Sequence, residues 1–193
     1  MSDYQLSDER LIEKFQNGEV NAYNELVKRY KDRLLNFIYR FLNDIDRSED
    51  LVQDTLIKLY THKNSYKEVA KFSTWLYTIA ANLARTELRK IKRRKTFSVS
   101  ELSNDDREYI ISSDASDQSE DYLTENFEKK IQNALVQLPD DFKTIIILRD
   151  IQELSYDEIS KIVELPLGTV KSRINRGRLK LQKLLKKKGE NPY

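Results

Sequence analysis

The sequence has 193 residues, of which 39% are hydrophobic and 34% are charged, with no cysteine and a net charge of +2. A charged share above the roughly 25% of an average globular protein favours small, thinly cored helical units over one large core. The lack of cysteine excludes disulfides and thiolate chemistry, and no apolar run approaches the roughly 18 residues of a membrane span, so we expect a cytoplasmic protein without direct membrane insertion.

The first half of the chain is dominated by helical periodicity. Ser7 is a candidate cap for a short helix that Gly18 stops, a longer apolar pattern covers 23–41, and Asp46 or Ser48 can start a third helix. The segment "THKNSYKEVAK" breaks the pattern and is predicted to be a loop. The pattern resumes in "FSTWLYTIAANLARTELRKIKRRK". No stretch shows sustained two-residue alternation, so we expect no sheet.

Charge is strongly segregated along the chain. Seven basic residues lie within 85–95, ten acidic residues within 96–128, and nine basic residues within 171–188. The Ser-, Asp- and Glu-rich segment 96–124 buries too little apolar surface to offset the entropy of ordering, so it is predicted to be a flexible acidic linker. The sequence therefore predicts an all-α protein with two small helical domains, 1–95 and 125–193, joined by this linker. Two basic blocks around an acidic one are typical of two polyanion-binding surfaces.

The stretch "LSYDEISKIVELPLGTVKSRINRGRLKLQ" predicts a helix-turn-helix. Ser155 and Glu158 have the spacing of a capping box, and Pro166 ends the first helix and suits the start of the second. At about 100° per residue, the second helix places its apolar residues and Gly177 on one side. The opposite side suits a major groove, where Lys or Arg can pair with guanine and Asn with adenine. Its candidate base-reading residues are Thr169, Lys171, Ser172, Asn175 and Arg176.

Three further residues of this helix have their own interpretations. Arg173 and Arg178 flank the apolar stripe and are better placed for phosphates, which hold register without reading sequence. Leu179 stays exposed on the outer face and is a candidate protein contact. The alternative for the whole stretch is a solvated basic helix that ends a helical hairpin.

The helix from Phe72 onward predicts a second polyanion site. Its aromatic residues Phe72, Trp75 and Tyr77 precede a track of cations, and this combination suits single-stranded bases because rings stack while cations hold the backbone. The alternative places Phe72 and Trp75 in the core. In "EDLVQDTLIKLY", acidic residues precede an apolar face. Taken alone, these acids indicate by default a solvated helix start, which the helix dipole favours.

Five blocks in order resemble the extracytoplasmic-function (ECF, group IV) sigma factors of bacterial RNA polymerase. They are "AYNELVKRYKDRLLNFIYRFL", "SEDLVQDTLIKLY", "KFSTWLYTIAANLARTELRK", "LPDDFKTIIILRDIQELSYDEIS" and "LPLGTVKSRINRGRLKL". The resemblance implies a sigma region 2 domain, which docks on the clamp helices of the polymerase beta-prime subunit and melts the −10 element. It also implies a sigma region 4 domain, which reads the −35 element and contacts the beta flap, with the linker threading the RNA-exit path between them.

The resemblance also implies roles for residues at matching positions. Core polymerase would be bound by Asp50, Gln53 and Asp54. A flipped non-template base would be cradled by Asn64, Ser65 and Tyr66, and the melted −10 strand would be lined by Phe72, Ser73, Trp75, Asn82, Arg85 and Arg89. The −35 element would be read by Thr169, Lys171, Ser172, Arg173 and Arg176, and the helical projection above adds Asn175 and Arg178 as contacts to the −35 duplex. Factors of this group are usually held inactive by an anti-sigma factor, which is therefore an expected partner.

Other classes of function make different predictions. A stand-alone helix-turn-helix regulator would bind duplex operators tightly without polymerase and would not need Asp50 or Gln53. An enzyme is poorly supported, because His62 is the only histidine and lies without metal-ligand spacing, and the four glycines form no phosphate-binding loop. No metal and no cofactor are expected. A helical protein–protein adaptor remains open, and loss of all DNA binding would point to it.

Overall fold

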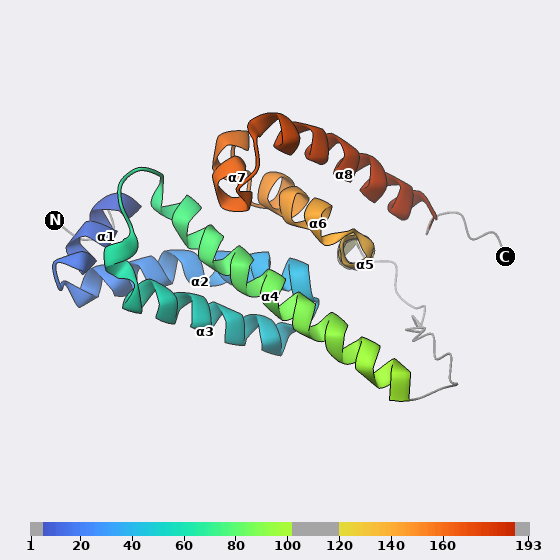
Figure 1. The fold of residues 1–193 in the computed structure, drawn as a ribbon, viewed down its shortest axis with the longest axis horizontal. Coiled ribbons are helices and arrows are strands. Elements are labelled where there is room, and N and C mark those ends of the chain that lie inside the picture. Colours follow the sequence, from blue (N-terminus) through green and yellow to red (C-terminus); the bar gives the residue numbers. More distant parts are fainter. Residues whose placement is uncertain (1–5, 102–119, 188–193) are drawn as a thin grey trace.

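The computed structural model describes residues 6–101 and 120–187, and every regular element in these two ranges is helical (Figure 1). The first range contains α1 (Asp8–Gln16), α2 (Val20–Leu42), α3 (Ile45–Thr61), the short 3-10 turn η2 (Lys63–Ser65) and α4 (Phe72–Glu101). The second contains α5 (Glu120–Gln137), α6 (Asp140–Ile146), the π-helical turn η3 (Ile147–Ile151), α7 (Tyr156–Val163) and α8 (Leu167–Lys187). The all-α prediction is confirmed.

The first three helices are bounded by local signals. Ser7 caps α1, as predicted, by accepting a hydrogen bond from the Arg10 amide at 3.2 Å. Gly18 follows the helix with φ +99°, a conformation that glycine adopts without steric cost. The predicted cap of α3 was wrong: Asp44, rather than Asp46 or Ser48, is the N-cap residue.

α3 begins earlier than predicted because the Asp44 carboxylate, which precedes both predicted caps, already binds a free amide of the first turn. The Asp44 side chain accepts from the Arg47 amide at 3.1 Å. Ser48 lies one turn inside the helix, is buried, and donates its hydroxyl to the Asp44 carbonyl. A cap satisfies amides that have no partner within the helix, so the first suitable side chain in extended backbone sets the boundary.

The N-terminal unit is built from α2, α3 and α4, with α1 crossing their end near the start of α4 (Figure 1). Its core is rich in aromatic rings. Phe37 contacts both Phe41 and Tyr77 with centroids 5.1 Å apart, and Tyr30 meets Phe72 edge-on at 5.5 Å. These rings bury large apolar areas in a unit of modest size, which compensates for the high share of charged residues.

The C-terminal unit is built from α5 to α8. Pro139 precedes α6, and the four consecutive residues Ile145–Leu148 are all buried where α6 passes into η3. The helix α8 packs across α6, with Val170 and Ile174 on its buried side. The unit therefore has a core of its own beneath α8.

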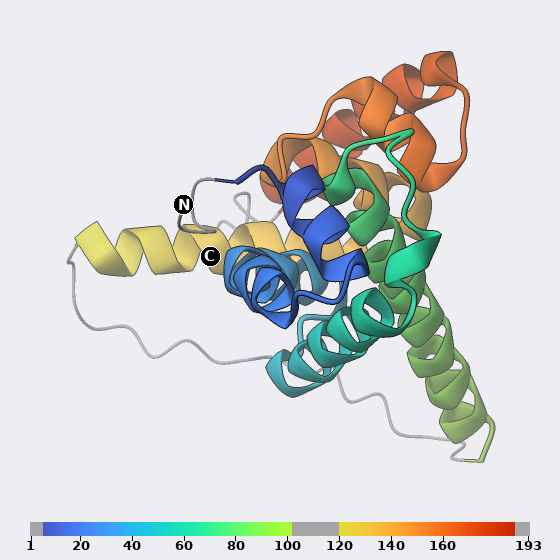
Figure 2. The same ribbon diagram turned by 90° about the vertical axis from the view of Figure 1, so that its left-hand side faces the viewer.

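The two units are in contact along α2 and α4. α5 packs on α2, and α7 packs on α4. The Tyr77 hydroxyl donates to Gln152 Oε1 at 2.5 Å, and an ion pair of 3.0 Å joins Lys71 Nζ to Glu158 Oε1. Gln132 on α5 donates to the Tyr39 carbonyl on α2 at 3.2 Å. Figure 2 shows α5 and the distal half of α4 leaving this shared body in different directions.

Helices reach into both ends of the predicted linker. α4 continues to Glu101 and α5 begins at Glu120, whereas the linker was predicted to cover 96–124. Extending an existing helix by a few residues costs less free energy than nucleating a new one, so α4 continues beyond the end of its apolar pattern. The central part of the predicted linker, 102–119, lies outside the described residues.

Candidate nucleic-acid and protein interfaces

The acidic residues of α3 form a solvent-facing stripe. Asp50, Gln53 and Asp54 are exposed, while Leu51 and Val52, which lie between Asp50 and Gln53, are buried. Residues three and four apart lie on one face of a helix, so the three side chains are neighbours. The structure therefore brings together the residues predicted to bind core polymerase.

An apolar residue that sequence reasoning missed extends this stripe. Ile57 lies one turn beyond Asp54 on the same face and is 57% exposed. The apolar period of α3 places Leu59 in the core but puts Ile57 on the polar side. The sequence does contain a signal for Ile57, because an isoleucine at an outward position of an amphipathic helix is unusual enough to mark a candidate contact residue. An exposed aliphatic side chain rimmed by polar groups has the layout of a protein-docking face, whose centre is apolar and whose rim is polar.

The loop before α4 exposes only part of the predicted base-capture set. Asn64 and Ser65 in η2 are exposed. Tyr66 is only 7% exposed, its hydroxyl donates to the Ala70 carbonyl at 2.9 Å, and its ring packs 5.6 Å from that of Trp75. The Tyr66 ring therefore supports the loop from inside, and Asn64 and Ser65 are the side chains that face solvent.

The aromatic residues of α4 differ in their access to solvent. Phe72 is 0% exposed and packs in the core, so its ring does not line a surface; the core alternative holds for this residue. Tyr77 is equally buried: its ring packs on Phe37 of α2, and its hydroxyl bonds to Gln152 of the other unit. Trp75 and Ser73 are half-buried. Among the predicted stacking rings, only Trp75 therefore reaches the surface.

The polar residues of α4 form a continuous outward track. Asn82 and Arg89 are exposed and Arg85 is half-buried. Arg85 donates to Asn82 Oδ1 at 2.7 Å, and Arg89 donates to Thr86 Oγ1 at 3.3 Å. These short-range bonds hold the guanidinium groups along the helix without neutralising them. The track continues through exposed Lys92 and Arg93 toward the distal half of α4.

The start of α7 confirms the predicted capping box. The Ser155 hydroxyl accepts from the Glu158 amide at 3.3 Å, and Glu158 Oε2 accepts from the Ser155 amide at 2.8 Å. Burial opposes ionisation of Glu158, but the hydrogen bonds from Ser155 and the ion pair with Lys71 outweigh it and lower the pKa of the carboxyl. The first helix of the helix-turn-helix is therefore fixed at its N-terminus by a charged side chain.

The predicted recognition helix α8 divides into a buried and an outward side. Lys171, Ser172, Asn175 and Arg176 are exposed, and Thr169 is half-buried. On the opposite side, Gly177 is buried against α6. The structure therefore places all five candidate base-reading residues away from the packed side, four of them exposed.

Two arginines of α8 are held by acids from other elements. Arg173 Nη1 lies 3.2 Å from Asp141 Oδ2, and Arg178 Nε donates to Asp150 Oδ2 at 3.1 Å with a second bond from its Nη2 to the other oxygen. The hydrogen bonds from Arg178 to Asp150 raise the pKa of the guanidinium further. No local sequence signal predicted these pairs, because the acids lie 32 and 28 positions earlier. To bind phosphates, Arg173 and Arg178 must either break these ion pairs or contact the phosphate with N–H groups that the ion pairs leave available.

Two other kinds of site are not found in the described ranges. Within residues 6–101 and 120–187, no group of three or more His, Cys, Asp or Glu side chains has the arrangement of a metal site. No helix in the same ranges is long and apolar enough to cross a membrane.

Comparisons with known proteins match both units. The family model of Sigma-70 region 2 matches residues 26–94, and that of Sigma-70, region 4 matches residues 128–181. The RNA polymerase sigma-H factor of Pseudomonas aeruginosa is 32% identical over 185 residues, which cover 94% of this chain and 95% of that protein. The ECF RNA polymerase sigma factor SigW of Bacillus subtilis is 34% identical over 178 residues, covering 91% and 95%.

The fold is also similar to a solved structure. The sigma factor RpoE from Bartonella quintana, crystallised in complex with the anti-sigma factor NepR, matches with a TM-score of 0.64 and 27% identity. The match covers 85% of this chain and 96% of that chain. The two matched family ranges place the polar track of α4 in the first region and the outward side of α8 in the second.

Proposed function

This chain belongs to the ECF group of the sigma-70 family of RNA polymerase sigma factors, and on this premise we propose that it binds core polymerase through α3 and directs promoter-specific initiation through α4 and α8. The proposal is supported by two outward polar faces: the track of α4, which lies in the range that matches region 2, and the outward side of α8, which lies in the range that matches region 4. The activity is DNA binding and melting rather than catalysis. It takes place in the cytoplasm, where core polymerase acts.

The polymerase contact uses the α3 stripe. The carboxylates of Asp50 and Asp54 steer the approach of a basic partner surface, and Ile57 adds apolar area that leaves water on docking. The clamp helices of the beta-prime subunit are the partner. The exposed Leu179 on α8 supplies a second contact, to the beta flap.

The −10 element is held by η2 and by the outward track of α4. Asn64 and Ser65 accept a flipped base, Trp75 stacks, and Asn82, Arg85 and Arg89 follow the strand. Unstacking and unpairing a base costs a few kcal/mol, which this binding offsets without nucleotide hydrolysis.

The −35 element is read by the first turns of α8. Lys171, Ser172, Asn175 and Arg176 reach base edges in the major groove, with Thr169 beside them. Arg173 and Arg178 approach the flanking phosphates and exchange part of their pairing with Asp141 and Asp150 for it.

Simultaneous contact with both elements requires the units to separate. The roughly 25 base pairs between the elements span about 85 Å at about 3.4 Å each. A compact chain of 193 residues has a radius of gyration of about 16 Å. The segment 96–124 is the tether between the two domains, and polymerase sets their effective concentration on the promoter. The expected anti-sigma factor acts by keeping the α3 and α4 faces away from these partners.

The proposal is tested by transcription in vitro from a library of genomic fragments. Core polymerase with this protein initiates from a subset of promoters that core alone ignores. The double variant Asp54→Ala, Ile57→Ala binds core at least about tenfold more weakly, because both substitutions lie in the same docking face. Asp157→Ala, which removes an exposed acid from the other unit, is the matched control and keeps wild-type affinity.

Two results would reject the proposed function. One is no initiation from any fragment. The other is tight, specific binding of duplex DNA by the isolated protein with core affinity that does not depend on Asp54 and Ile57, which identifies a stand-alone regulator.

A further inference from the structure

The turn that carries Asn64 and Ser65 is closed by a side chain from α1. Gln16 donates its Nε2 to the Lys63 carbonyl at 2.7 Å and to the Tyr66 carbonyl at 3.1 Å. These two carbonyls flank the exposed pair, so one amide group holds both ends of the turn. Gln16 is the last residue of α1 and lies before the range 26–94 that matches region 2.

A second contact runs from the turn back to α1. Lys63 donates its Nζ to the Phe15 carbonyl at 2.7 Å and lies 4.4 Å from the centre of the Phe15 ring. A cation beside the last carbonyls of a helix is favoured by the helix dipole. Phe15 is fully packed in the core, so the turn is tied to a fixed point.

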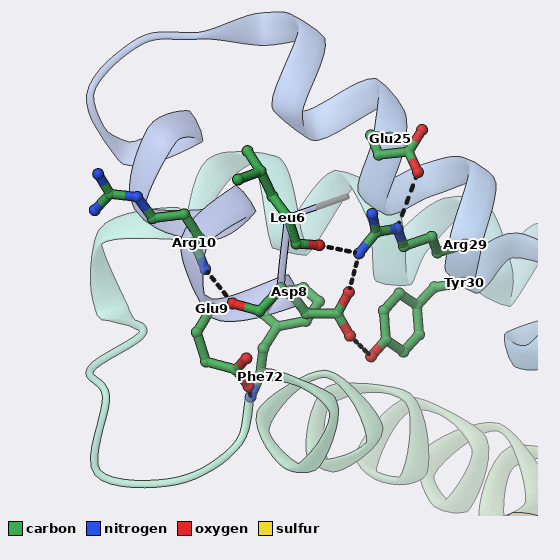
Figure 3. A network of polar contacts seen from close by, with 9 residues as sticks. Leu6, Asp8, Glu9, Arg10, Glu25, Arg29, Tyr30 and Phe72 are labelled. Atoms are coloured by element: carbon green, nitrogen blue, oxygen red, sulfur yellow. Dashed lines mark hydrogen bonds and ion pairs between the residues drawn. The ribbon is translucent and has the colours of Figure 1, made fainter. Parts of the chain in front are cut away.

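The other end of the loop is also attached to α1. Glu9 Oε1 accepts a hydrogen bond from the Phe72 amide at 3.1 Å, where α4 begins (Figure 3). The first amides of a helix have no partner within it, so Glu9 caps α4 from a different element. The segment from Lys63 to Phe72 is therefore held by α1 at both of its ends.

α1 is in turn anchored to α2. Asp8 accepts from Arg29 Nη1 at 2.9 Å and from the Tyr30 hydroxyl at 2.5 Å (Figure 3). Arg29 also donates to the Leu6 carbonyl and pairs with Glu25. Burial and the Asp8 carboxylate raise the pKa of Tyr30 far above its ordinary value, so the phenol stays a donor. This network fixes α1 as a rigid support.

We propose that Gln16 is a positioning residue for base capture, which holds Asn64 and Ser65 in the geometry that reads a flipped −10 base. This inference rests on the proposed function of the η2 turn. A turn fixed before binding loses less conformational freedom when the base arrives, so affinity and discrimination both increase. Gln16 acts through the two carbonyls and touches no DNA itself.

The test compares base preferences on a promoter library with randomised −10 and −35 elements. Core polymerase is loaded with each variant, and the transcripts are sequenced. Gln16→Glu keeps the side-chain shape but replaces both N–H donors by an acceptor that repels the carbonyls. We expect its discrimination at the captured −10 base to fall about tenfold, as befits the loss of two hydrogen bonds. Its −35 preference stays that of the wild type.

The matched control is Gln137→Glu. This exposed glutamine also donates its Nε2 to a carbonyl, that of Asn133 at 3.2 Å, but it lies on α5. It carries the same change of charge and leaves both preferences unaltered. Gln16→Met removes the donors without adding charge and flattens the −10 preference as Gln16→Glu does.

The outcomes separate this inference from the function on which it rests. If the wild type shows no promoter preference, the proposed function fails. If the wild type reads the −10 element and both Gln16 variants read it equally sharply, the positioning role is overturned. Loss of core-polymerase binding by both Gln16 variants overturns it too, since Gln16 would then stabilise the whole N-terminal unit.

Discussion

Gly177 faces α6 from the packed side of α8. A Cβ atom at this position would lie 3.0 Å from Ile146 Cγ1 and 3.2 Å from Ile146 Cδ1. Ile146 is itself 1% exposed and enclosed by the core, so it cannot move aside without disturbing its neighbours. The glycine therefore sets how closely the recognition helix approaches its support.

We expect Gly177→Ala to lower the free energy of unfolding by about 1 kcal/mol, because overpacking costs about 1–3 kcal/mol and outweighs the gain of up to about 1 kcal/mol from helix propensity. Gly168→Ala is the control, since a Cβ there meets no atom within 4 Å. It leaves stability unchanged or slightly raised. Urea unfolding measures both, and a Gly177→Ala variant as stable as the wild type would contradict the close packing.

At the scale of the element, α7 depends on a charged cap. Glu158 accepts two hydrogen bonds from Ser155 and pairs with Lys71 at the start of α4. One carboxylate thus closes the N-terminus of α7 and joins it to the other unit. The folded-state pKa of Glu158 is below its ordinary value of 4.5. Its contribution to stability is therefore present above that pH and is lost as the pH falls through the folded-state pKa.

We expect Glu158→Gln to lower the free energy of unfolding by about 1 kcal/mol at pH 7, the usual worth of an N-terminal cap. The difference from the wild type shrinks as the pH falls below 4.5, where the wild-type carboxyl also becomes neutral. Urea unfolding at a series of pH values measures this. Glu49→Gln, an exposed carboxylate of α3, is the control. A difference that is constant with pH would show that the charge of Glu158 contributes nothing.

At the scale of the whole molecule, the C-terminal unit packs on one side of α4 in the N-terminal unit. α7 packs on α4, where Tyr77 is buried and bonded to Gln152 of the other unit, while Asn82 and Arg85 lie on the outward track. α7 therefore flanks the track without covering its exposed members. The contact is partly polar, with Tyr77, Lys71 and Gln132 each bonded across it. Polar contacts exchange readily with water, which suits the separation of the units proposed for promoter binding.

We expect Tyr77→Phe to raise the population of separated units about fivefold, because one interface hydrogen bond is worth about 1 kcal/mol. The chain has no cysteine, so Lys31→Cys and Lys183→Cys provide one labelling site in each unit for distance measurement by energy transfer. Tyr23→Phe is the control, since its hydroxyl bonds to the Leu56 carbonyl inside one unit. An unchanged distance distribution in Tyr77→Phe would mean that this bond does not hold the units together.

Several features were predicted from the sequence because their causes are local. The cap at Ser7 and the capping box at Ser155 depend on residues three positions apart, and the outward side of α8 depends on helical spacing. The stripe of Asp50, Gln53 and Asp54 follows from the same periodicity. The cap at Asp44 was missed because two later residues also had the right chemistry.

The sequence by itself determined the helical class, the two units and the outward sides of α3 and α8, since these follow from periodicity and from residues within one turn of each other, and its five motif blocks indicated the family. Only the tertiary structure decided that the Tyr66 and Phe72 rings are buried, that Asp150 holds Arg178, that Gln16 closes the η2 turn and that α7 packs on α4. These contacts join residues 28 or more positions apart, or depend on which neighbours cover a side chain. Their geometry arises from packing, to which no local pattern in the chain corresponds.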